Sequence, residues 1–183
     1  KGDCLAVRVY TQSRFTHVAA VVDDGGRCKV YDSTNGVGVR CLELAEYLQR
    51  QTPGEIEIVK PRRTFSQRQC EKFHAALQEQ LGRPYSVTHH LTGQRAEGLD
   101  CSEYVMDALM AADVMRAKNP PRVSPASLHE GVQKNETYVP VLCTTLCDPP
   151  PAPADNWCGQ YWLDTKRCTK RCYLKLRGWF CCY

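Results

Sequence analysis

Residues 99–105 read Leu-Asp-Cys-Ser-Glu-Tyr-Val and open a run of apolar residues at helical spacing. This run predicts a helix over 101–115 with Asp100 as its N-cap. Cys101 then lies in the first turn, where unpaired backbone N–H groups and the positive end of the helix dipole favour a thiolate. A nucleophilic cysteine needs this placement together with a base. The alternative is that Cys101 is a small buried residue at a helix start.

Two β-rich segments that precede this helix predict a hairpin. Residues 16–22 (Thr-His-Val-Ala-Ala-Val-Val) and 28–32 (Cys-Lys-Val-Tyr-Asp) are rich in β-branched and aromatic residues, and Asp-Asp-Gly-Gly at 23–26 separates them. Asp-Gly between two apolar runs is a strong short-range signal for a hairpin. We therefore expect these two strands to pair antiparallel.

The register of this hairpin decides which residue faces His17. With a two-residue turn at 24–25, His17 lies opposite Asp32, and directly opposed Cβ atoms are about 4.5–5.5 Å apart. A turn at 25–26 places Thr34 there instead. The first register supplies a nucleophile, a base and an orienting carboxylate, which are Cys101, His17 and Asp32. Taken alone, a histidine in an apolar strand is more often a hydrogen-bonded core residue.

The remaining periodic segments indicate an α+β fold. Apolar spacing predicts helices over 42–50 and 66–81, the second with a capping box at Ser66 and Gln69 and a stop at Gly82. Alternation and β-branched content predict further strands, over 4–10, 55–60 and 137–142. The last of these contains Pro140, which restricts it to a sheet edge.

Composition divides the chain of 183 residues at a polyproline segment, 149–153. Residues 1–142 are long enough for one hydrophobic core and predict a single domain. Residues 143–183 predict a Pro-rich linker followed by a basic, aromatic, Cys-rich tail. Residues 1–154 are electrically neutral, whereas the residues after them carry six basic and two acidic side chains, which account for the net charge of +4. All three tryptophans also lie in this tail.

The cysteine content is unusual, with seven of the 12 cysteines after residue 142. This density favours an oxidising compartment, and hence a secreted or cell-envelope protein, although the sequence leaves the compartment open. For the tail, disulfides are slightly favoured over a four-cysteine zinc site. Cys70 and His74 are spaced to share a metal on one helix, but Cys70 belongs to the apolar stripe and core packing is favoured. No metal site or cofactor is therefore predicted.

The sequence does not indicate a membrane span or a nucleic-acid partner, and it leaves contact with anionic surfaces open. No apolar run approaches the about 18 residues that a membrane span needs. Nothing indicates a nucleic-acid partner. The basic, aromatic tail is compatible with weak contact with anionic surfaces, and equally with a solvated cap.

The motifs together resemble the permuted papain-like amidases of the YaeF/YiiX type, which are relatives of the NlpC-type cell-wall peptidases. The resemblance covers about residues 2–115 and rests on five motifs: Gly2-Asp3, Thr16-His17-Val18, Val30-Tyr31-Asp32, Gly82-Arg83-Pro84-Tyr85 and the segment 100–105. Histidine precedes cysteine in this chain, which is the permuted order. The chain departs from the family in carrying Asp32 where glutamate is frequent and Asp100 where many permuted members carry an aromatic residue.

The resemblance implies a permuted papain-like (NlpC-type) fold, in which an antiparallel sheet packs against the nucleophile helix. It implies that Cys101 attacks an acyl carbonyl, with His17 as base and later acid, and that the backbone N–H of Cys101 and Tyr85 hold the oxyanion. The expected function is a cofactor-free cysteine amidase or peptidase-like hydrolase acting on an amide or ester bond of a peptide, cell-wall fragment or lipid. An acyltransferase or thioesterase on the same fold and a non-catalytic secreted module remain alternatives.

Overall fold

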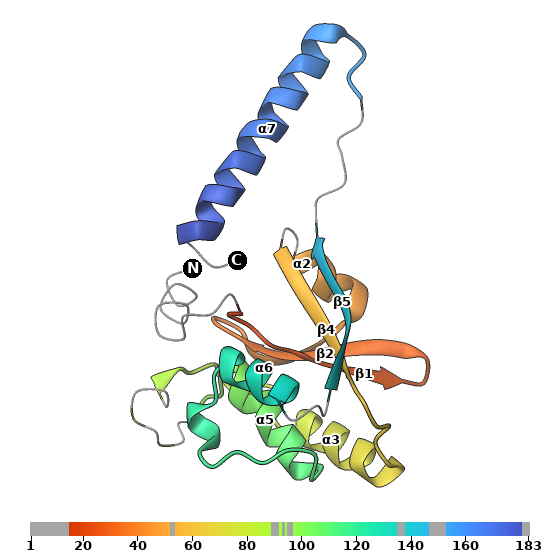
Figure 1. Ribbon diagram of the computed structural model, residues 1–183, viewed down its shortest axis with the longest axis vertical. Helices are drawn as coiled ribbons and strands as arrows, with labels where there is room; N and C mark the ends of the chain where they lie inside the picture. Colours follow the sequence, from red (N-terminus) through yellow and green to blue (C-terminus); the bar gives the residue numbers. More distant parts are fainter. Residues whose placement is uncertain are drawn as a thin grey trace.

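The computed structural model describes residues 15–51, 54–88, 92, 94, 97–134, 138–146 and 153–180. These residues form a mixed α+β body with two small antiparallel sheets, and one long helix that stands away from it (Figure 1). The α+β class is therefore confirmed. The strand expected over 4–10 lies outside the described residues.

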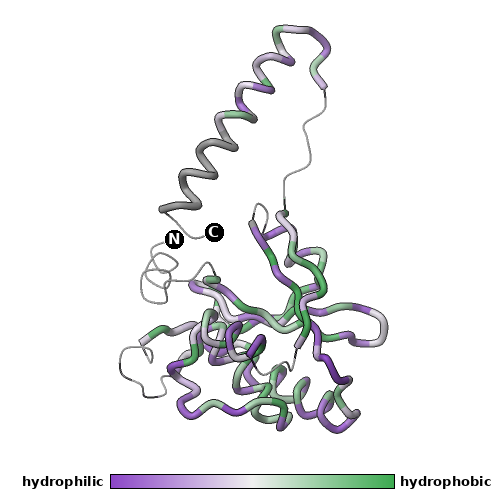
Figure 2. Tube along the Cα trace, in the orientation of Figure 1, coloured by the Kyte–Doolittle hydropathy of each residue, from purple (hydrophilic) through white to green (hydrophobic). Residues whose placement is uncertain are grey.

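The first sheet contains three antiparallel strands in the order β1 (Ala20–Asp24), β2 (Arg27–Thr34) and β3 (Gly38–Glu43). The central strand β2 is buried on both faces, because consecutive residues 30–33 are all almost fully excluded from solvent. In Figure 1, helices α3 and α5 lie on one side of this sheet, and α2 with the second sheet lies on the other. Figure 2 shows hydrophobic residues following the strands of both sheets.

The hairpin register predicted from a turn at 24–25 is wrong. The ladder pairs Ala20 with Tyr31 and Asp24 with Arg27, so the turn lies at Gly25 and Gly26. Both glycines have positive φ, 64° and 87°, which a tight hairpin turn requires at its two central positions. Strand β1 also begins at Ala20, so the first residues of the predicted strand, 16–19, precede the ladder.

Strand β3 is absent from the sequence prediction, although a signal for it exists. Asn35-Gly36 lies between β2 and β3, and Gly36 has a φ of 79°. Asn-Gly between two apolar segments is a strong hairpin signal. At the start of β3, a Cβ on Gly38 would lie 2.2 Å from the carbonyl oxygen of Arg83. Only glycine allows this approach, which brings the segment around residue 83 against β3.

Two predicted helix starts are confirmed. Helix α3 (Gln67–Glu79) begins after Ser66, and the capping box with Gln69 is present. Helix α5 (Cys101–Ala111) begins where predicted, with Asp100 as its N-cap, but it ends four residues earlier than expected. The other helical elements are α2 (Leu44–Gln51), the 3₁₀ turn η1 (Pro120–Arg122) and α6 (Pro125–Lys134).

The main core lies between the first sheet and the pair α3 and α5. Tyr104 of α5 donates its hydroxyl to the carbonyl oxygen of Leu77 in α3, at 2.8 Å, which joins the two helices inside the core. The cluster also includes Tyr31, Val39, Leu99, Met106 and Leu109. Cys70 is exposed, so its predicted core packing is wrong; Leu77 is the buried residue of α3.

The second sheet pairs β4 (Gly54–Pro61) with β5 (Tyr138–Leu146). Pro140 lies at a bulge in this ladder, since Ile58 pairs with Leu142 but Val59 pairs with Pro140. A bulge in a two-stranded sheet accommodates the missing N–H of proline. Strand β5 continues to Leu146, past the expected strand end and domain boundary at 142.

The tail forms helix α7 (Trp157–Phe180), which stands apart from the body in Figure 1. Among the described residues, no helix has both the length and the apolar content needed to cross a membrane. The seven cysteines whose side chains the structure describes, among them Cys143, Cys158 and Cys168, are free thiols, so no disulfide joins any two of these seven. The linker residues 147–152 lie outside the described residues, and the division into a domain and a tail stays a prediction.

Candidate active site

The start of α5 is fixed by a polar network around Asp100. The Asp100 carboxylate accepts a hydrogen bond from the backbone N–H of Glu103 at 2.7 Å. It also accepts one from the hydroxyl of Ser102 at 3.0 Å. These side chains are almost fully buried, which strengthens their hydrogen bonds and holds Cys101 at one position in the first turn. Cys101 is itself buried, 4% exposed.

The residues before Cys101 are tied to the sheet and to the turn at 82–85. Ser33 of β2 donates its hydroxyl to the carbonyl oxygen of Leu99 at 2.7 Å. The Leu99 N–H donates to the carbonyl oxygen of Pro84 at 2.9 Å. Tyr85, the predicted substrate-binding residue, follows directly and is half-buried. The motifs around Pro84 and Cys101, 17 residues apart in sequence, thus lie side by side.

His17 contacts Asp32, as predicted, although the register used to predict the contact is wrong. The distance from His17 Nε2 to Asp32 Oδ2 is 3.1 Å. Continuing the observed register beyond β1 would place Thr34 opposite His17. Asp32 is then the diagonal neighbour on the same face, which long side chains reach. The contact is therefore compatible with either turn.

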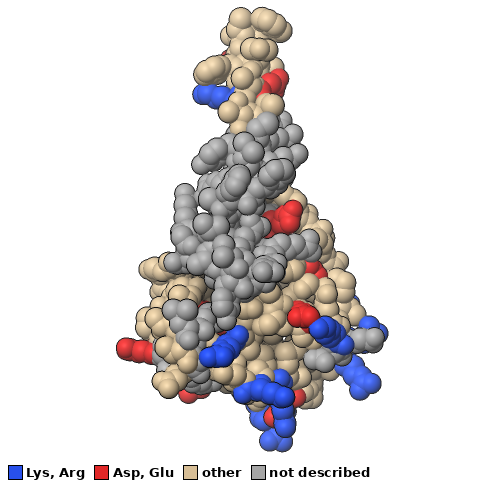
Figure 3. All heavy atoms as spheres, turned by 60° about the vertical axis from the view of Figure 1, so that its left-hand side comes forward, with Lys and Arg blue, Asp and Glu red and all other residues tan. Residues whose placement is uncertain are grey.

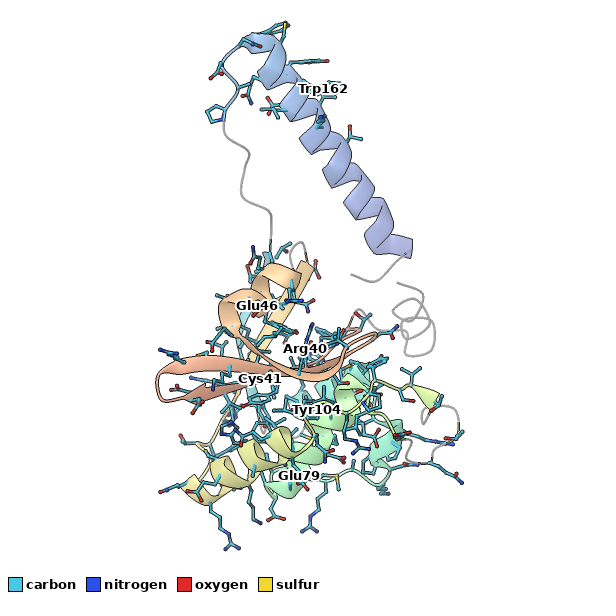
Figure 4. All side chains as sticks on the ribbon, turned by 180° about the vertical axis from the view of Figure 1, so that it is seen from behind. Arg40, Cys41, Glu46, Glu79, Tyr104 and Trp162 are labelled. Carbon is cyan, nitrogen blue, oxygen red and sulfur yellow. The ribbon has the colours of Figure 1, made fainter. Side chains whose placement is uncertain are left out.

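Arg40 of β3 is a site residue that the sequence pattern does not reveal. It pairs directly with Asp32 across the ladder. Its Nε donates to Asp32 Oδ1 at 2.8 Å and its Nη2 to Oδ2 at 3.2 Å. Burial acts to raise the pKa of Asp32, but hydrogen bonds from His17 and Arg40 outweigh it and hold that pKa below its usual range. The fully buried carboxylate is therefore ionised and held by two partners (Figure 4 labels Arg40).

The structure brings His17 to Cys101 as well as to Asp32. Burial acts to lower the pKa of His17, but the Cys101 thiolate and hydrogen bonds with Asp32 and Cys101 raise it to about 10. Because Nε2 faces Asp32, Nδ1 is the ring nitrogen left for the thiol. The imidazole thus lies between a thiol and a carboxylate, and carries its proton when the thiol is ionised.

Tyr47 of α2 is a second residue near this centre. Burial raises the pKa of its hydroxyl, and the negative charges of Asp32 and Cys101 raise it further. Tyr47 is 8% exposed and is the buried residue of α2. The short helix expected over 42–50 therefore covers the site on the side of the sheet that carries Arg40.

The other described histidines lie elsewhere. His74 Nε2 is 2.8 Å from the hydroxyl of Tyr31, and the Cys70 thiol points toward the carbonyl of Phe65, so Cys70 and His74 do not form a metal-binding pair. His129 Nε2 is 3.3 Å from Glu57 Oε2. In the part of the chain that the structure describes, no three His, Cys, Asp or Glu side chains are grouped to hold a metal ion.

No family model matches the chain, and no curated protein matches it. The structure is similar to the crystal structure of metalloprotein YiiX from Escherichia coli O157:H7, with a TM-score of 0.62 and 17% sequence identity. The similarity covers 76% of this chain and 89% of YiiX. This chain has the YiiX fold. The resemblance to the YaeF/YiiX type drawn from the five motifs is confirmed as a likeness of fold, and the permuted papain-like arrangement stays a prediction.

Proposed function

We propose that this protein is a cysteine hydrolase with a permuted papain-like core, which cleaves an amide or ester bond through an acyl-enzyme on Cys101. The observation that carries the proposal is the position of the His17 ring, whose Nε2 lies 3.1 Å from Asp32 Oδ2 and whose pKa is raised by the nearby Cys101 thiolate. A nucleophile, a base and a group that orients the base are what acyl transfer by a thiol requires.

Before acylation the thiol proton has already passed to His17, and the Cys101 thiolate attacks the substrate carbonyl carbon. A C–S bond forms, and the carbonyl π electrons move to the oxygen. The backbone N–H of Cys101 has no acceptor within its own helix, because it belongs to the first turn, and we assign it to the oxyanion together with Tyr85. The C–N or C–O bond then breaks, and the leaving group takes the proton from His17.

In the deacylation step, His17 accepts a proton from water as the water oxygen attacks the thioester carbon. The C–S bond breaks, the carboxylic acid leaves, and the proton stays on His17, which restores the pair of imidazolium and thiolate. Asp32 stabilises the imidazolium that forms in both steps and fixes the ring orientation. Arg40 holds Asp32 in place through two hydrogen bonds and acts as a positioning residue.

YiiX is described as a metalloprotein, and thiolate, imidazole and carboxylate are ligands that zinc accepts. The residues of this chain do not fit such a site. Both Asp32 oxygens already accept hydrogen bonds, Oδ1 from Arg40 and Oδ2 from Arg40 and His17, so a cation at this carboxylate would have to displace them. We therefore assign no catalytic step to a metal.

The test is to incubate the full chain with small aryl esters and peptide anilides and to follow both the products and the intact mass. We expect free acid in the product and a transient acyl adduct that maps to Cys101. Cys70→Ser, at an exposed cysteine, is the matched control and should behave as the wild type. Transfer of the acyl group to an added amine or alcohol in preference to water would make the protein an acyltransferase. An unchanged rate in Cys101→Ser would refute the proposal.

A further inference from the structure

Helix α7 carries large aromatic side chains that are exposed to solvent. Trp157 is 79% exposed, Tyr161 65% and Trp162 59%. The rings of Trp157 and Tyr161 stack, with centroids 6.0 Å apart. Exposed aromatic groups that gather on one element mark an interaction site more often than a solvated surface. In Figure 3, most of the described end of α7 is uncharged on the face drawn.

The helix is amphipathic along its length. At about 3.6 residues per turn, its aromatic, cysteine and threonine positions fall on one side. This side includes Trp157, Cys158, Tyr161, Trp162, Thr165 and Cys168, and the same spacing continues in the sequence with Cys172, Leu176 and Trp179. The basic positions fall on the other side, at Lys166, Arg167, Lys170, Arg171 and Arg177. Lys175 on the first side and Leu163 and Leu174 on the second are the exceptions.

Lys166 lies at the border between the aromatic side and the basic side of α7. Its ammonium lies 5.0 Å from the centre of the Trp162 ring, so that the cation sits beside the aromatic side. Trp and Tyr combine an apolar ring with a polar tip and are enriched where hydrocarbon meets water. Basic residues next to such rings match the anionic headgroups found at the same depth.

We propose that α7 binds in the plane of an anionic lipid surface, with its aromatic side in the boundary between headgroups and acyl chains. The charge of the chain supports this partner, because residues 1–154 are neutral and the whole excess of +4 lies in the segment that contains α7. A soluble polyanion would satisfy the basic side but leave the aromatic side in water. No described helix is apolar enough to cross a bilayer, so the helix is assigned to lie on the surface. The proposal is independent of the catalytic one.

The tryptophans give a direct test, because all three in the chain lie in α7 and tryptophan emission therefore reports on this helix alone. The full chain is titrated with vesicles of phosphatidylcholine, with or without phosphatidylserine, and sedimented with them. We expect a blue shift of the emission and co-sedimentation only with anionic vesicles, weakened by salt. Lys166→Ala should weaken binding about fivefold, the effect expected for one basic residue near such a surface.

Two variants separate the aromatic side from exposed apolar residues in general. The triple variant Trp157→Ala, Tyr161→Ala, Trp162→Ala should no longer co-sediment with anionic vesicles. Its far-UV circular dichroism spectrum should show that the protein is still folded. Val37→Ser is the matched control, because Val37 is 61% exposed and lies outside α7. It should bind as the wild type.

Four results would overturn the proposal. These are the absence of a shift with anionic vesicles, equal binding to neutral vesicles, an equal shift with a soluble polyanion such as heparin or RNA, and unchanged binding of the triple variant. Emission already blue-shifted without vesicles, in a dimer that the triple variant dissociates, would assign the aromatic side to a second copy of the chain instead.

Discussion

The described part of the body contains two similar pairs of histidine and carboxylate, and their surroundings differ. His17 and Asp32 are 3.1 Å apart, and His129 and Glu57 are 3.3 Å apart. The two histidine side chains are almost equally exposed, at 24% and 23%. The pair geometry alone therefore does not distinguish a reactive centre from a contact that links two elements.

The two pairs differ in the further groups that each histidine contacts. His129 packs its ring on Phe15, with centroids 4.1 Å apart, and its Nε2 is 3.1 Å from the side-chain amide of Gln133. His17 instead lies next to the thiol of Cys101. The Asp32 carboxylate that His17 contacts is also held by Arg40. The pair at His129 joins α6 to β4, whereas the pair at His17 has a nucleophile on one side and a fixed anion on the other.

The largest effect should come from the thiol. Cys101→Ser should lower hydrolysis by about 10⁴-fold or more, because the hydroxyl is a far weaker nucleophile and His17 loses its thiolate partner. Steady-state rates with the best substrate found are the measurement. His129→Ala, which removes the other pair, should leave the rate within a few-fold of wild type. If His129→Ala were as damaging as Cys101→Ser, the contrast between the two pairs would disappear.

A smaller effect is expected at the carboxylates. Asp32→Asn should lower turnover by about 10²-fold or more, since the amide neither stabilises an imidazolium nor fixes the ring as the anion does. Glu57→Gln is the matched variant at the second pair and should change turnover little. Equal turnover in Asp32→Asn and wild type would remove Asp32 from the centre.

Substitution of Arg40 should lower the free energy of unfolding. Arg40→Gln leaves the fully buried Asp32 carboxylate without its guanidinium partner, which typically costs about 3–5 kcal/mol of unfolding free energy. The exposed pair of Arg50 and Glu46 offers the control, and Arg50→Gln should cost no more than about 0.5 kcal/mol. Denaturant unfolding measures both. Equal losses would mean that burial of Asp32 adds nothing to the Arg40 contact.

The parts of the fold that short-range signals encode were predictable. The capping box at Ser66 and the N-cap at Asp100 involve residues three apart, and both helices begin where those signals place them. The position of Cys101 in the first turn followed from the same signal. Such interactions form within one turn of chain and depend little on the rest of the molecule.

The parts that depend on pairing across the chain were predicted less well. Gly25 and Gly26 allow a turn that Asp24 and Gly25 also allow, and the choice shifts the register by two residues. The sequence does not predict Arg40 as a site residue, because it does not predict β3. No local pattern marks Asp32 of β2 as the partner of Arg40. Strand β4 was expected, but its partner β5 lies about 80 residues away, and sequence periodicity gives no pairing over that separation.

The most direct test of the central claim is an NMR titration of the His17 imidazole in the wild type and in Cys101→Ser. We expect the wild-type ring to stay protonated through neutral pH, with a pKa near 10, and to lose its proton at clearly lower pH in Cys101→Ser, where no thiolate remains. The NMR signal of His129, in the second pair, is identified by its absence from the spectrum of His129→Ala. Titration of His17 at the same pH in both proteins would show that the imidazole and the thiol do not interact, and would contradict the proposed active site.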